Sequence, residues 1–110
     1  MDMNVFCLVQ TSIDDEAKAE AIAEALVTQR LAACVQIAPV RSVYIWKGAV
    51  ARAEEWMVLV KTRSDLAAEV IEAITDQHPY ETPEVVSFPF GRGAPDYFMW
   101  IHDSTVVALR

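Results

Sequence analysis

The sequence has few cysteines, few glycines and few basic residues, and each scarcity argues against a class of protein. Its two cysteines, Cys7 and Cys34, lack CxxC spacing and so predict neither a zinc site nor a redox motif. Their apolar neighbours favour buried free thiols. The three glycines do not form a phosphate-binding loop. Nine basic against sixteen acidic residues give a net charge of −7, which argues against nucleic acid and anionic membranes as partners.

Membrane and secretion signals are also missing. No segment approaches the roughly 18 consecutive apolar residues that a membrane span requires. The N-terminal stretch MDMNVFCLVQ has no basic region and no long apolar run, which is not the pattern of a signal peptide. We therefore expect a cytoplasmic protein.

What is present is the composition of a small globular domain. With 54% apolar and 23% charged residues in a chain of 110, we expect a single domain over residues 1–110. A domain of this size is only marginally stable alone. Three Trp, three Tyr and four Phe nevertheless supply large apolar surfaces. We expect part of that surface to be covered by another copy of the chain.

Hydrophobic patterning predicts an α+β fold. The expected helices are 14–31 and 65–78, and the expected strands are 4–12, 33–48, 54–63, 83–90 and 97–104. The order β-α-β-β-α-β, with a short extra C-terminal strand and tail, is the ferredoxin-like plan, whose two helices cover one face of the sheet. Pro39 predicts a bulge or an edge in the second strand, and segment 48–54 a loop. The other sheet face lacks a cover, which predicts oligomerisation through the sheet.

The stretch QHPYETPE gathers most of the candidate site residues. His78 could ligate Cu(II) or Zn(II), with Tyr80 and the carboxylate of Glu81 nearby. Pro79 breaks the helix, so His78 and Glu81 do not share a helix face. The simpler interpretation is that His78 ends the helix by meeting its free carbonyls, while Pro79 and Pro83 stiffen the entry to the next strand.

A second group of candidates lies on the two central strands. Tyr44 and Trp46 share one side of their strand and Trp56 lies on the partner strand, so these aromatic residues could line a ligand cleft. Lys47 or Lys61 could then contact an anion. The alternative is an interface core, in which Tyr and Trp are commonly enriched, and a cleft often forms at such an interface.

No catalytic constellation is evident. The serines lack a G-x-S-x-G setting. His102 and Asp103 are adjacent on a predicted strand, so they would point to opposite faces rather than form a dyad. We therefore expect no enzymatic activity and no organic cofactor.

Five blocks, RLAACVQI, SVYIWKG, EEWMVLVKT, HPYETPEVV and DYFMWI, together resemble the CutA family of divalent-cation tolerance proteins. The resemblance covers nearly the whole chain. It implies a compact homotrimer similar in plan to the signalling protein PII, with hairpin strands pairing across subunits and a cleft between neighbours. Metal binding, signalling and protein anchoring have all been proposed for the family.

The resemblance also implies candidate site residues. Some members carry a cysteine and a second histidine, credited with copper binding, where this chain has Gln10 and Gln77, so only His78 of that trio remains. We expect a trimer that binds a divalent metal such as copper, or a small ligand, at an intersubunit cleft. The expected metal contact is His78, and the expected cleft wall is formed by Trp46, Lys61, Tyr80 and Glu81. The alternative is a PII-like signalling or scaffolding trimer that docks a protein partner without metal chemistry.

Overall fold

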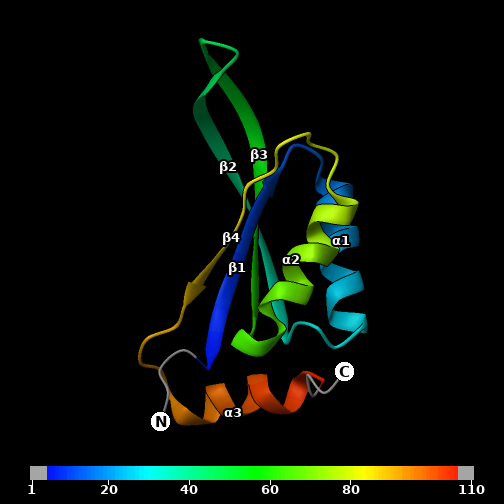
Figure 1. The fold of residues 1–110 in the computed structure, drawn as a ribbon, viewed down its shortest axis with the longest axis vertical. Coiled ribbons are helices and arrows are strands. Elements are labelled where there is room, and N and C mark those ends of the chain that lie inside the picture. The colour runs from blue at the N-terminus through cyan, green and yellow to red at the C-terminus, as the bar shows by residue number, and fades with distance from the viewer. Residues whose placement is uncertain (1–4, 107–110) are drawn as a thin grey trace.

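The computed structural model describes residues 5–106, which form one four-stranded sheet and three α-helices (Figure 1). The elements are β1 (Phe6–Ile13), α1 (Glu16–Thr28), β2 (Cys34–Trp46), β3 (Ala49–Arg63), a 3₁₀ turn (Ser64–Leu66), α2 (Ala67–Gln77), β4 (Val85–Pro89) and α3 (Pro95–Ser104). The sheet order is β2-β3-β1-β4, and every neighbouring pair is antiparallel. This is the predicted ferredoxin-like plan.

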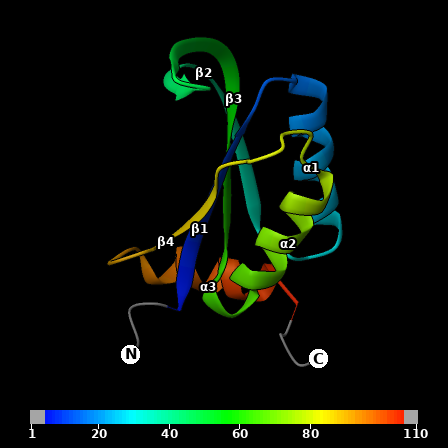
Figure 2. The same cartoon turned by 45° about the horizontal axis from the view of Figure 1, so that its top comes forward.

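Helices α1 and α2 cover one face of the sheet, as the sequence predicts (Figures 1 and 2). From the sheet, Val9, Val58 and Val60 are fully buried, and from the helices Leu26 and Ile74 meet them in one cluster. Fully burying each such side chain contributes about 1.5–3 kcal/mol. Asp15 caps the start of α1, because its carboxylate accepts the Lys18 N–H at 3.1 Å. The hydrophobic contacts between helices and sheet therefore hold this part of the fold together.

The predicted fifth strand, 97–104, is wrong: this segment is the helix α3, which lies across the end of the sheet (Figure 1). Pro95 occupies the first helical turn, where its fixed φ and missing N–H favour a helix start. Phe98 stacks on Phe6 with ring centroids 4.9 Å apart, and Ile101, one turn later, is fully buried. Packing at helical spacing thus overrides the β propensity of the aromatic residues. Most of the predicted tail, 107–110, lies outside the described residues.

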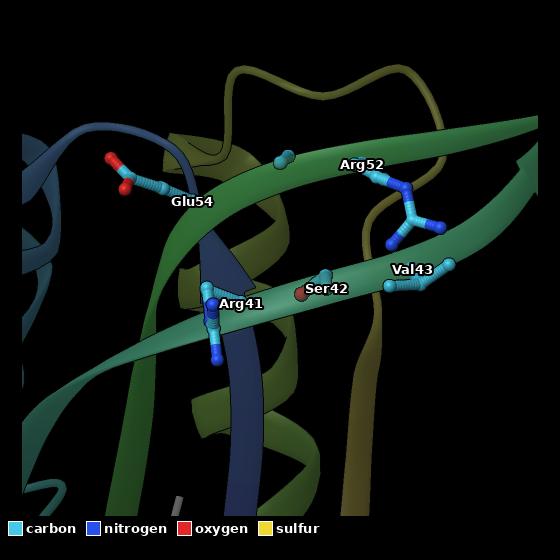
Figure 3. Close-up of a pocket in the computed structure, with 6 residues that line it drawn as sticks. Arg41, Ser42, Val43, Arg52 and Glu54 are labelled. Atoms are coloured by element: carbon cyan, nitrogen blue, oxygen red, sulfur yellow. The ribbon is translucent and has the colours of Figure 1, made fainter.

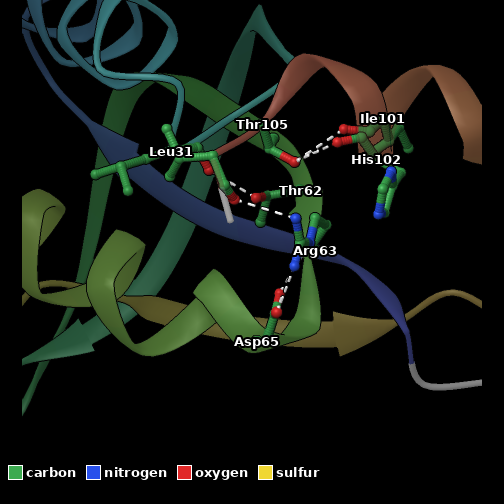
Figure 4. Close-up of polar contacts among 8 residues, drawn as sticks. Leu31, Thr62, Arg63, Asp65, Ile101, His102 and Thr105 are labelled. Carbon is green, nitrogen blue, oxygen red and sulfur yellow. Dashed lines mark hydrogen bonds and ion pairs between the residues drawn. The ribbon is translucent and has the colours of Figure 1, made fainter. Parts of the chain in front are cut away.

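A polar network joins α3 to the sheet and to the loop after α1 (Figure 4). The nearly buried Arg63 donates to both carboxylate oxygens of Asp65, at 3.0 and 2.6 Å, and to the carbonyl of Val106 at 3.1 Å. Thr62 donates its hydroxyl proton to the carbonyl of Leu31 at 2.6 Å. The hydroxyl of Thr105 donates to the carbonyls of Ile101 and His102, so the end of α3 also has its buried polar groups satisfied.

Strands β2 and β3 continue well beyond the rest of the sheet (Figures 1 and 2). The pairing of β1 ends where Ile13 meets Trp56, so residues 40–55, which we call the arm, pair only with each other. Segment 48–54 is predicted as a loop, but only Gly48 belongs to the turn and β3 begins at Ala49. A two-residue turn suffices here, because Lys47 and Gly48 both have positive φ, at 51° and 79°.

Pro39 pairs with Trp56 within β2, which is an edge strand of the sheet in one subunit. Of its two predicted effects, the edge position is therefore found. A proline at an edge is tolerated because the ladder loses no hydrogen bond on the open side.

Candidate functional site

The 78–84 turn, between α2 and β4, is held by the imidazole of His78. His78 follows the last residue of α2, and its Nε2 lies 2.8 Å from the carbonyl oxygen of Ser12 at the end of β1. Its Nδ1 accepts the backbone N–H of Tyr80 at 3.1 Å. The ring also meets that of Tyr80 edge-on, with centroids 4.7 Å apart. His78 thus ends α2, as the simpler interpretation predicts, but its imidazole meets the carbonyl of Ser12 on β1 and not the free carbonyls of the helix.

Tyr80 links the turn to the base of the arm. Its hydroxyl donates to Glu55 Oε2 at 2.7 Å, and Glu55 is buried although it carries a carboxylate. Burial, together with this bond and the neighbouring charge of Glu55, raises the pKa of Tyr80 well above its usual range. The sequence did not single out Glu55. A carboxylate at an inward-facing position of an otherwise apolar strand is nevertheless a signal for a buried polar group that needs a partner.

The two glutamines that stand where the resemblance implies metal ligands have partners of their own. The side-chain amide of Gln10 donates to Glu84 Oε2 at 2.9 Å, which ties β1 to the end of the turn. That of Gln77 donates to the carbonyl of Ala73 within α2 at 3.2 Å. Neither amide joins His78.

The predicted site residues occupy three separate places in one subunit. His78, Tyr80 and Glu81 lie in the turn, with Glu81 exposed. Lys61 lies near α3, with its Nζ 5.8 Å from the ring centre of Tyr97. Trp46 lies at the tip of the arm, where it pairs with Ala49. Twelve residues along β3 separate that partner from Lys61, which at strand rise is about 40 Å. A single cleft containing both Trp46 and Lys61 therefore needs a second copy of the chain.

The arm carries charged residues that the sequence analysis did not single out. Arg41 on β2 and Arg52 and Glu54 on β3 line a concave surface of about 550 Å³ together with Val43 (Figure 3). Arg41 pairs with Glu54 and Val43 with Arg52, so all four side chains leave the same face of the hairpin. The alternation of side chains along the two strands could have indicated that these residues share one face.

A second concave region, of about 600 Å³, lies beside α3. Its walls are apolar, and include Phe6, Phe90, Phe98 and Met99. His102 also lines it and lies 3.2 Å from Asp103, measured from Nδ1 to Oδ1. The prediction that this pair would point apart is wrong, because it assumed a strand and the segment is helical. Both side chains are more than half exposed, so the pair is not a shielded dyad.

The two cysteines differ in their surroundings. Cys7 is buried, and burial raises the pKa of its thiol. Cys34 is only half-buried, so the expectation of a buried thiol holds for Cys7 alone. Burial falls short at Cys34 because it begins the edge strand β2.

A divalent metal, which the resemblance implies, does not fit these residues. Within residues 5–106, no three or more His, Cys, Asp or Glu side chains are grouped so as to hold a metal ion. The His78 ring nitrogens already have protein partners. In the same part of the chain, no helix is both long and apolar enough to cross a membrane.

The fold and these surfaces define a ferredoxin-like α+β domain with open concave regions and a long bare hairpin arm. The chain belongs to the CutA1 divalent ion tolerance family, because the family profile described as CutA1 divalent ion tolerance protein matches residues 7–104. The family assignment made from the five sequence blocks is thereby confirmed.

Known relatives agree with this assignment. Protein CutA of Mus musculus is 40% identical over 92 residues, covering 83% of this chain and 52% of the mouse protein. Divalent-cation tolerance protein CutA of Thermus thermophilus is 38% identical over 99 residues, covering 89% of this chain and 96% of that protein. The solved structure of the periplasmic divalent cation tolerance protein CutA from Archaeoglobus fulgidus superposes with a TM-score of 0.87 at 34% identity, covering 90% and 97% of the two chains. The chain thus spans about half of the mouse relative and nearly all of the Thermus one.

Proposed function

We propose that this chain acts as a homotrimeric divalent-cation tolerance protein of the CutA type, whose intersubunit cleft binds a small ligand. The role is binding, without a catalytic step. Trp46 would form an aromatic wall, Lys61 would contact an anionic group, and Tyr80 and Glu81 would close the cleft from the turn. The expected metal contact at His78 is left out of this proposal, because the imidazole nitrogens are engaged within the subunit.

The single observation that carries the proposal is the exposed apolar surface of the arm. Ile45 is 69% exposed, Val50 64% and Trp46 49%. Monomeric proteins rarely leave so many large apolar side chains together in water. The arm's β2 edge also offers unpaired backbone groups to another strand. Covering this arm with another copy would bury these side chains and bring Trp46 of one subunit toward the body of another.

Light scattering tests the association. We expect a mass three times the 12.3 kDa of one chain. The double variant Ile45→Ser, Val50→Ser should lower that mass, because it removes apolar area from the arm only. Val27→Ser is the matched control, since Val27 is an exposed apolar residue on α1. A mass of one chain for the unaltered protein would refute the proposal.

Calorimetric titration with naphthalene-2-carboxylate, an aromatic anion, tests the cleft. We expect saturable binding that Trp46→Ala or Lys61→Met weakens about tenfold, because one removes the stacking surface and the other the charge. Lys18→Met, on the exposed face of α1, is the control. Binding unchanged in both cleft variants would remove these residues from the site, even if the protein is a trimer.

A further inference from the structure

The imidazole of His78 has a role that the family name does not suggest. We infer that His78 is a positioning residue of the 78–84 turn, fixed as the Nε2–H tautomer, and that it is no metal ligand in this chain. His78 makes its contacts inside one subunit, so its role does not depend on the trimer or on the cleft.

The two contacts of the ring assign its tautomer. A backbone N–H is only a donor, so the N–H of Tyr80, 3.1 Å from Nδ1, requires an unprotonated Nδ1. A carbonyl oxygen is only an acceptor, so the carbonyl of Ser12, 2.8 Å from Nε2, requires a proton on that nitrogen. Both requirements are met by one neutral form of the ring. The protonated ring would place a proton on Nδ1 against the N–H of Tyr80.

This tautomer leaves no lone pair for a metal. Imidazole binds a metal through an unprotonated nitrogen. In His78 the Nε2 lone pair is replaced by a proton, and the Nδ1 lone pair is taken by the Tyr80 N–H. A metal at either atom would first have to break one of these bonds. The Tyr80 ring, 4.7 Å away by centroids, also packs against the imidazole.

The contacts form a continuous path across three elements. It runs from the Ser12 carbonyl on β1 through His78 to Tyr80, and from the Tyr80 hydroxyl to Glu55 on β3. Gln10 and Glu84 add a parallel link between β1 and the far end of the turn. His78 therefore determines where the turn presents Tyr80, and it acts through that residue.

Nitrogen-15 NMR of the imidazole rings in the unaltered protein tests the tautomer and the metal together. We expect the His78 pattern of one protonated Nε2 and one unprotonated Nδ1, unchanged by up to about tenfold excess of ZnCl₂. His102, exposed on α3, is the internal control for weak zinc binding. A saturable shift of the His78 nitrogens, at zinc concentrations that leave His102 unchanged, would overturn the inference, as would an Nδ1–H pattern before zinc is added.

Two conservative substitutions separate the two hydrogen bonds. In His78→Asn the side-chain oxygen takes the place of Nδ1 and keeps the bond to Tyr80, whereas in His78→Gln the amide nitrogen takes the place of Nε2 and keeps the bond to Ser12. Hydrogen exchange of the Tyr80 amide should rise about tenfold in His78→Gln and stay within about twofold in His78→Asn. A merely space-filling role would give the same exchange rate in both variants and would contradict the inference.

Calorimetry with CuCl₂ completes the test. The isotherms of the unaltered protein, His78→Asn and His78→Gln should coincide, whether the metal binds weakly elsewhere or does not bind. Both variants retain one of the two hydrogen bonds, and circular dichroism verifies that each remains folded. A loss of copper affinity of about tenfold or more in both folded variants would establish His78 as a ligand.

Discussion

Strands β2 and β3 pass through two different environments, and the contrast is the main lesson of this fold. In the body of the domain, residues 5–39 and 56–106, the sheet carries Val58 and Val60 under helices α1 and α2, where both are fully buried. In the arm, residues 40–55, side chains of the same kind, Ile45 and Val50, are exposed to solvent. The strands are continuous and the ladder between them is regular throughout.

In the proposed trimer, one hairpin would therefore serve two purposes. Apolar residues of the body stabilise the subunit, because the helices that cover them belong to the same chain. Those of the arm contribute little to the subunit, and in the proposed trimer another copy of the chain would cover them. The Tyr80–Glu55 bond lies where the two regions meet, since Glu55 is the last arm residue before β1 joins the sheet.

Replacing one isoleucine in the body and one in the arm should give the largest difference in the free energy of unfolding. Ile74→Ala, in the buried cluster on α2, should cost about 2–5 kcal/mol of unfolding free energy because it leaves a cavity. Ile45→Ala should cost the subunit less than about 0.5 kcal/mol, and its effect should appear as subunit dissociation before helix is lost. Urea titration followed by circular dichroism and light scattering distinguishes these outcomes. Equal loss of helix stability in both variants would contradict the division into body and arm.

The body was largely predictable from the sequence. Apolar residues at helical spacing, including Ile22, Leu26, Val70 and Ile74, identified α1 and α2, and the order of elements then specified the ferredoxin-like plan. The segment of α3 was mistaken for a strand because its aromatic residues favour strands, whereas its contacts with Phe6 and the sheet end favour a helix. Those contacts join residues about 90 positions apart, so they cannot be predicted from the local sequence pattern.

The candidate site was predictable only in part. The Pro-bounded turn and the terminating role of His78 follow from local chemistry. Its partner Ser12 lies 66 positions away and Tyr80's partner Glu55 lies 25 away, so neither contact has a local signal. The distance between Trp46 and Lys61 likewise depends on strand register, which tertiary packing and turn geometry determine together.

Replacing one arginine in the body and one in the arm should give a smaller difference in the free energy of unfolding. Arg63→Ala should cost about 1.5–3 kcal/mol, because the nearly buried guanidinium bonds Asp65 and the Val106 carbonyl. Arg52→Ala, on the exposed arm, should cost less than about 0.5 kcal/mol. Chemical denaturation at neutral pH measures both. A cost at Arg52 that matches the cost at Arg63 would show that the arm is held by polar contacts within the subunit.

Matched tyrosines give the smallest difference and test the junction between arm and body. Tyr80→Phe should cost about 1 kcal/mol at pH 8, since it removes the bond to Glu55, whereas Tyr44→Phe on the arm should cost close to nothing. Because the folded protein raises the pKa of Tyr80, the stability it supplies is complete below the usual tyrosine pKa of about 10 and falls as the pH rises above it.

The Tyr80→Phe variant has no hydroxyl to ionise at this position, so it does not lose this stability at high pH. The stability difference between the unaltered protein and Tyr80→Phe should therefore be smaller at pH 11 than at pH 8, as urea unfolding at both values would show. A difference that stays constant would mean that the hydroxyl ionises as easily in the folded protein as in the unfolded chain, and one that widens would mean that it ionises more easily in the folded protein. In either case the Tyr80–Glu55 bond would not be one of the contacts that fasten the arm to the body.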